Sequence, residues 1–229
     1  MKHKFTFFIT TGVLALFLLA FSACKKAPQP INPNPNPAPA GNFTSLEVHG
    51  SVNVILSPDT INKATSTLSG NVVYNYQGHT LILSGSGIAA VSIKALDALT
   101  VTGSANVVNT DTLRMDQLAI TSHGSSTIDL KLIVKNNLAI KVTGSSDNYT
   151  LAGNCPKIAT DISGSPNIHA YSLVTNDCAV AMNGSGNCEV YSTNSLSADL
   201  TGSSILYYKG NPPTVNTISI TGTSKLVKQ

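Results

Sequence analysis

The segment IKVTGS at residues 140–145 carries the pattern that decides the fold, and it returns 40 residues later as VAMNGS at 180–185. In both copies, apolar residues lie two and four positions before the glycine, with other residues between them. This period of two is typical of a strand with one buried face. Apolar residues also lie four and six positions after the glycine, as at Cys188 and Val190. Each unit is therefore predicted to be a strand, a Gly-Ser corner and a second strand.

The Gly-Ser pair recurs from Gly50 to Gly202, in inverted order at Ser69-Gly70, and a Gly-Thr pair at Gly222 ends the series. Successive glycines are 15 to 21 residues apart, and five of the nine steps are 20 residues. Such a period indicates a repeat architecture, in which each strand stacks on the one before at about 4.8 Å. We predict an all-β fold, namely a single-stranded parallel β-helix (β-solenoid) of about ten coils of ~20 residues. The helix is expected to be right-handed, because crossover connections between parallel strands generally are. A β-sandwich is the alternative, although its hairpins rarely keep a fixed register.

The chain before this repeat divides into two segments. Residues 1–23 are typical of a signal peptide, because Lys2 and Lys4 precede an apolar run that ends in small residues. The segment LAFSAC at 19–24 resembles the lipobox of bacterial lipoproteins, which implies cleavage before Cys24 and lipidation of its thiol. A plain signal peptide and an uncleaved membrane helix are the alternatives. The proline-rich residues 24–41 are predicted to form an extended tether, and residues 42–229 one folded domain.

The net charge gives little indication of a charged partner. The formal charge of +3 comes from 14 basic and 11 acidic residues, and removal of Lys2 and Lys4 would leave 12 basic residues. Arg114 is the single arginine of the chain. A nearly neutral domain with one arginine does not predict a nucleic-acid partner.

Several of these features together resemble a known family. The opening residues Phe43, Leu46, Val48 and Gly50, the LIL strand at 81–83 and the Gly-Ser repeats are similar to the head GIN domain family. Its members are adhesin-type domains that often occur on lipoproteins of Bacteroidetes bacteria. The resemblance extends over residues 43–227 and implies a parallel β-helix. It supplies no catalytic residues.

Three cysteines lie in the predicted domain. Cys188 occupies an inward position and is expected to be a small buried hydrophobe. Cys155 and Cys178 precede strands of adjacent coils, where stacked Cα atoms are close enough for a disulfide, and we predict that they form one. Paired Cys or His spacing is absent from the sequence, so neither a metal site nor a cofactor is expected.

One outward surface is a candidate binding site. The strands after the later corners are predicted to present an amphipathic platform for sugar rings or a protein partner, formed by His169, Tyr171, Glu189, Tyr191, Tyr208 and Lys209. An ordinary solvated strand face is the alternative. His169 and Glu189 have the chemistry of an acid/base pair, but the remaining carboxylates are scattered, which weighs against an enzyme.

The sequence thus predicts a lipid-anchored binding or adhesion protein of the bacterial cell envelope. The protein is expected on the outer membrane and is not expected to be an enzyme. Its expected partners are the membrane, through the N-terminal lipid, and a glycan or an envelope or host protein. Two alternatives stay open: a periplasmic scaffold without an external ligand, and a carbohydrate-active β-helix enzyme.

Overall fold

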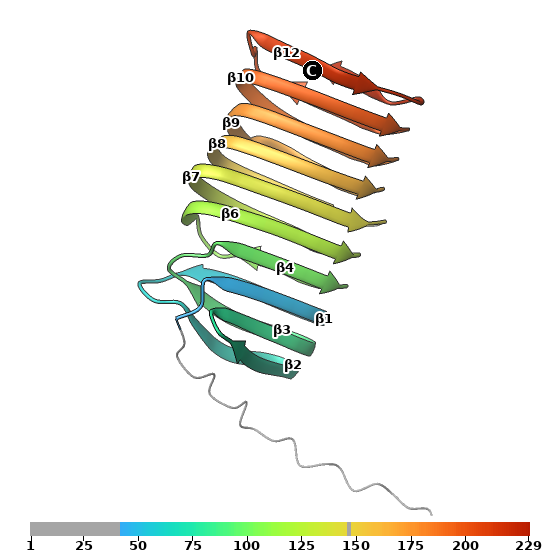
Figure 1. Ribbon diagram of the computed structural model, residues 1–229. Helices are drawn as coiled ribbons and strands as arrows, with labels where there is room; N and C mark the ends of the chain where they lie inside the picture. Colours follow the sequence, from blue (N-terminus) through green and yellow to red (C-terminus); the bar gives the residue numbers. More distant parts are fainter. Residues whose placement is uncertain (1–41, 146–147) are drawn as a thin grey trace, which may run out of the picture. The chain divides into compact units, whose positions relative to one another are not determined.

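The computed structural model describes residues 42–145 and 148–229, and these residues form one stack of β-strands (Figure 1). The predicted signal peptide (1–23), the lipidation site Cys24 and the tether (24–41) lie outside the described residues. The described part of the chain contains strands and turns but no helix, and therefore no helix that could cross a membrane.

The strands are named in chain order. They are β1 (Ser45–Pro58), β2 (Lys63–Gln77), β3 (Thr80–Ile93), β4 (Ala98–Gly103), β5 (Asn106–Asn109), β6 (Leu113–Gly124), β7 (Thr127–Gly144), β8 (Asn148–Gly164), β9 (Asn167–Gly184), β10 (Asn187–Gly202), β11 (Ile205–Lys209), β12 (Thr214–Ile220) and β13 (Lys225–Lys228).

The strands β7 to β10 each make almost one complete coil and pair in parallel with their neighbours. The half of each coil after a Gly-Ser corner lies in one sheet, here the post-glycine face, which contains residues 148–154 and 167–174. The half before the next corner lies in the other sheet, the pre-glycine face, which contains residues 157–164 and 177–184. In Figure 1 the near strands run left to right as the chain ascends from β1 to β12, so the coil is right-handed.

The corner glycines stack directly on one another. Gly184 has a φ of +146°, and a Cβ atom at this position would lie 1.9 Å from the carbonyl oxygen of Gly164. The same relationship holds one coil earlier, where a Cβ on Gly164 would lie 2.0 Å from the Gly144 oxygen. Because any side chain would collide with the backbone of the coil before it, the repeat requires glycine at these corners.

The core consists of inward columns of apolar side chains. One column contains Val142, Ile162, Met182 and Leu200, which are register partners in successive coils and are at most 3% exposed. Burial of each such side chain stabilises the fold by about 1.5–3 kcal/mol. This alternation confirms the prediction of strands with one buried face.

The predicted number of coils is wrong: the solenoid has about six turns rather than ten. Part of the difference arises at the N-terminal end, where β2 pairs antiparallel with β3, so that Gly70 lies in a hairpin and not at the corner of a coil. The strand β3 pairs with one side of β1, while β4 pairs with the other side. The chain therefore reverses before it begins to ascend, and the hairpin covers the end of the stack.

Candidate ligand-binding face

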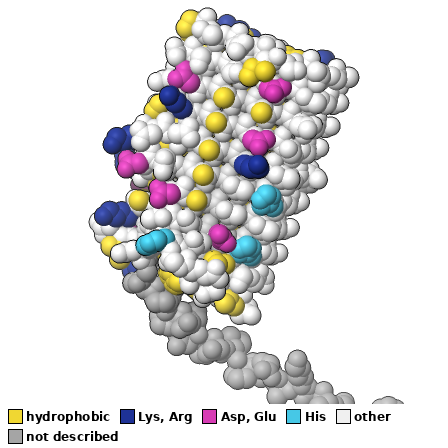
Figure 2. All heavy atoms as spheres, viewed as in Figure 1, with side chains coloured by type: hydrophobic (Ala, Val, Ile, Leu, Met, Phe, Trp, Pro, Cys, Tyr) yellow, Lys and Arg dark blue, Asp and Glu magenta, His cyan; other side chains and the backbone are white. Residues whose placement is uncertain are grey.

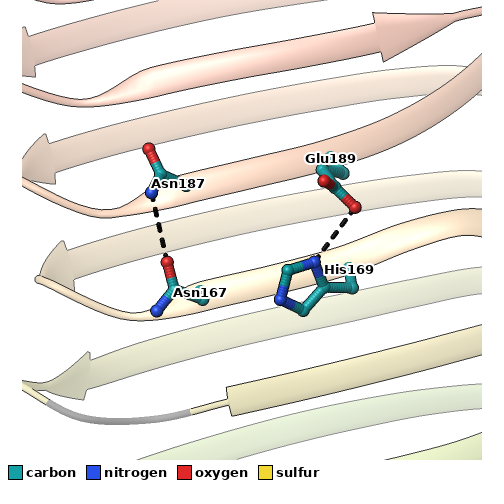
Figure 3. Close-up of polar contacts among 4 residues, drawn as sticks. All are labelled: Asn167, His169, Asn187 and Glu189. Atoms are coloured by element: carbon teal, nitrogen blue, oxygen red, sulfur yellow. Dashed lines mark hydrogen bonds and ion pairs between the residues drawn. The ribbon is translucent and has the colours of Figure 1, made fainter.

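The post-glycine face brings together His169 and Glu189, as the sequence predicted. They are register partners on β9 and β10, and His169 Nδ1 lies 3.0 Å from Glu189 Oε2. Two residues earlier on the same strands, Asn187 Nδ2 donates a hydrogen bond of 3.2 Å to Asn167 Oδ1. Figure 3 shows both contacts side by side on the outer surface. Polar side chains are thus connected from one coil to the next across this face.

Beside the column that contains His169 and Glu189 lies a second column, which contains Tyr171, Tyr191 and Lys209. Lys209 pairs in register with Tyr191, and its Nζ lies 4.1 Å from the centre of the Tyr171 ring, which is a cation–π contact. The register between β9 and β10 shifts after Val190, so that Tyr191 pairs with Val174 and not with Tyr171. Burial raises the pKa of Tyr171, and the nearby Glu189 carboxylate acts in the same direction. The tyrosine is therefore a neutral hydroxyl at physiological pH.

The predicted outward position of Tyr208 is wrong. Tyr208 is the register partner of the buried Val190 and packs against the core, whereas Tyr207 is the partner of Glu189 and extends the outward column. The signal was in the sequence, because positions four and six after each glycine point inward and Tyr208 is six residues after Gly202. The tyrosine patch is therefore defined as His169, Tyr171, Glu189, Tyr191, Tyr207 and Lys209.

The chemistry of the tyrosine patch is that of a binding surface. It combines aromatic rings with an imidazole, a carboxylate and an ammonium group on adjacent paired strands, which hold their relative positions. Tyrosine offers a large contact area together with a hydroxyl group and loses little conformational entropy on binding. Within residues 42–145 and 148–229, no three His, Cys, Asp or Glu side chains gather in a way that could hold a metal ion.

The predicted disulfide is absent from the structure, in which Cys155, Cys178 and Cys188 are free thiols. Cys155 is the register partner of Thr175, while Cys178 is the partner of Ile158. Each thiol has its own contact, at 2.8 Å from the Lys157 carbonyl oxygen for Cys155 and 2.8 Å from Thr175 Oγ1 for Cys178. The buried position of Cys188 confirms its prediction as a small core residue.

The pre-glycine face is less polar at its centre. Ala98, Ala119, Ala139, Ala159 and Ala179 follow one another in register, and Figure 2 shows a line of hydrophobic side chains across the near strands. Beside this line, Lys141 and Asp161 form an exposed ion pair with an N–O distance of 3.3 Å. The alanine line was not predicted, although each of these alanines lies five residues before the glycine of its corner.

A comparison with protein-family models shows which family has these features. Residues 42–212 match the model of the family described as "Putative auto-transporter adhesin, head GIN domain". The chain belongs to this family. The search of curated proteins found no match for this GIN domain.

Several solved structures share the architecture of the GIN domain. A "putative adhesin" from Bacteroides fragilis is 19% identical, with a TM-score of 0.72 over 83% of this chain and 94% of that one. A "putative lipid binding protein" from Parabacteroides distasonis is 17% identical, with a TM-score of 0.58 over 82% and 93% of the two chains. A "putative adhesin" from Parabacteroides merdae is 18% identical, with a TM-score of 0.54 over 82% and 92%. Because the sequence identities are this low, the structural similarity shows only that the GIN domain shares its fold with these proteins.

Proposed function

We propose that this GIN domain is the binding head of a lipid-anchored adhesion protein in the bacterial cell envelope, and that the tyrosine patch contacts a glycan. The proposal is supported by membership in an adhesin family and by one observation in particular. Lys209 lies over the Tyr171 ring next to the His169–Glu189 pair, so aromatic and charged groups share one surface. Sugars have both apolar ring faces and hydroxyl groups, and this surface offers a partner for each.

The rigidity of the surface favours binding. The patch residues lie on three successive strands, β9, β10 and β11, whose parallel pairing determines their spacing. A ligand therefore meets groups that are already ordered, and association does not have to order them. Binding rather than catalysis is proposed, because Glu189 is the single carboxylate of the patch, whereas glycoside hydrolysis typically uses a pair of carboxyl groups.

The anchor is the second part of the proposal. The lipobox-like segment before Cys24 and the proline-rich residues that follow would hold the domain away from an outer-membrane surface. A Cys24→Ser variant should leave the membrane fraction, while the unchanged chain stays in it. Protease treatment of intact cells should release the folded domain by cutting the tether, if the domain faces the outside.

The test of the patch is binding of the full chain to an array of bacterial and host glycans, followed by titration with the best ligand. The double variant Tyr171→Ala, Tyr191→Ala should lose binding at unchanged stability. The control is Thr143→Ala with Thr201→Ala, two exposed residues of the pre-glycine face. Equal binding by both double variants would refute the role of the patch, and a wild-type chain that binds no glycan would favour the periplasmic scaffold.

A further inference from the structure

A groove lies at the corner where the post-glycine face turns into the pre-glycine face, away from the strands that form the tyrosine patch. Its volume is about 540 Å³, and its lining includes Lys94, Arg114 and Lys135. Ligand pockets typically measure about 300–1,000 Å³. Figure 2 shows Lys and Arg side chains, with Asp and Glu side chains among them, along the left edge of the molecule, where the near strands begin.

The positive groups come from three successive corners of the coil. Lys94 follows the end of β3, Arg114 is the second residue of β6, and Lys135 lies at the bend of β7. The first two corners are in direct contact, because the Leu96 amide donates to Met115 Sδ at 3.2 Å. The second and third are joined by the Arg114–Ile133 and Met115–Val134 register pairs. The cations therefore occupy three successive corners along the solenoid axis. They are not stacked in one column, because Arg114 pairs with Ile133, two residues before Lys135.

The charge in this groove is not balanced by the protein. Asp116 is the one carboxylate of the lining, and it lies 3.7 Å from Lys135. Both side chains are more than 70% exposed, so this pair is weak. Within the described residues, the side chains of Lys94 and Arg114 form no ion pair or hydrogen bond. Lys94 and Arg114 are thus available to a ligand, and Lys135 is available to the extent that its weak pair with Asp116 opens.

The floor of the groove is apolar. The half-buried Ile133 and Pro156 present apolar surface to the groove, and Met115 and Val134, at most 5% exposed, lie beneath it. A ligand that combines negative charge with an apolar face therefore fits this lining. Arg114 adds a planar fork of donors that matches a carboxylate in a bidentate way.

We propose that this corner groove binds an acidic polysaccharide, with the carboxylates of successive sugar rings on Lys94, Arg114 and Lys135 and the C–H faces of the rings on the floor. A polyuronate carries one carboxylate on every ring, and the groove carries about one cation on every coil. A linear polymer lying along the solenoid axis can therefore satisfy all three cations at once. This site is distinct from the tyrosine patch and does not depend on its role.

The test is calorimetric titration of the purified full chain with an oligogalacturonate, which is a uronate polymer of defined length. The fully methyl-esterified oligomer is the matched ligand control, because it has the same backbone without the charge. We expect binding of the acid form that weakens as the salt concentration rises, and no binding of the ester. Equal binding of both forms, or no binding of the acid form, would overturn the proposal.

Variants assign the binding to the groove. Lys94→Gln with Arg114→Gln should weaken oligogalacturonate binding by at least about tenfold, because two charged contacts are lost. Arg114→Lys should bind with intermediate affinity, since the charge stays but the fork is lost. The control is Lys225→Gln with Lys228→Gln, which removes the same charge at the other end of the solenoid and should leave binding unchanged. Equal weakening in both double variants would mean unspecific attraction and would refute the groove.

Two further measurements separate this proposal from others. Phosphatidylglycerol vesicles provide an anionic lipid surface, and binding to these vesicles in place of oligogalacturonate would overturn the polysaccharide in favour of a lipid. The Tyr171→Ala, Tyr191→Ala variant should bind oligogalacturonate as well as the unchanged chain does. Loss of binding in this variant would place the acidic ligand on the tyrosine patch and refute the groove.

Discussion

His169 on β9 and Glu189 on β10 are register partners, and their side chains meet on the outer surface with a distance of 3.0 Å between Nδ1 and Oε2. The contact joins two residues that are 20 positions apart, which is the period of the repeat. It is partly exposed, since the side chains of His169 and Glu189 are 49% and 27% accessible. Its location suggests a role in ligand contact more than in stability.

The first prediction follows from this exposure. Glu189→Gln should lower the free energy of unfolding by no more than about 1 kcal/mol, because solvent screens an ion pair at the surface. Chemical denaturation of the variant and the unchanged chain measures this difference. A loss of several kcal/mol would mean that the pair is a structural element of the solenoid.

The second prediction concerns the corner glycines. Gly184→Ala should destabilise the fold by more than about 3 kcal/mol or prevent folding, because its Cβ would lie 1.9 Å from the Gly164 oxygen. The control is Gly78→Ala in the β2–β3 turn, where φ is +60° and no atom lies within 4 Å of the new Cβ. This control should cost only about 1–2 kcal/mol. Similar stability losses in the two variants would contradict the role of the stacked corners.

The third prediction is the redox state of the cysteines. A Cys24→Ser chain, denatured without reductant, should contain three free thiols, because Cys155 and Cys178 are not register partners. Titration with a thiol reagent gives the number. A count of one thiol would instead indicate a disulfide, with Cys155 and Cys178 as the expected pair, and would contradict the free thiols of the structure.

The fourth prediction is a loss of stability at alkaline pH. Burial raises the pKa of the Cys188 thiol above its ordinary value of 9.0, so the unfolded chain releases this proton at a lower pH than the folded chain. The stabilising contribution is complete below pH 9 and declines as the pH rises beyond it, by about 1.4 kcal/mol per pH unit. Cys188→Ala should reduce this slope by about that amount in denaturation experiments between pH 8 and 11. An unchanged slope would show that another group causes the decline.

The tyrosine patch shows which features can be predicted by counting residues from each glycine. Position five after each glycine contains His169, Glu189 and Tyr207, and all three point outward on one column. The same count places Tyr208 inward, where the structure has it. Position seven likewise contains Tyr171, Tyr191 and Lys209, but counting does not show that the Lys209 side chain extends past Tyr191 to the Tyr171 ring.

The sequence by itself determined the solenoid, the corner glycines and the inward or outward direction of most side chains, because alternation and a 20-residue period are local properties that each coil repeats. The tertiary structure decided the order of the strands and the shape of the corners. The β2–β3 hairpin reverses the chain and removes Gly70 from the series of corners, and the pairing of β8 with β9 places Cys155 opposite Thr175 and not opposite Cys178. The groove around Arg114 likewise forms only when three corners stack. These features depend on pairing between segments far apart in the chain, and the free energy of that pairing is not encoded in any single repeat.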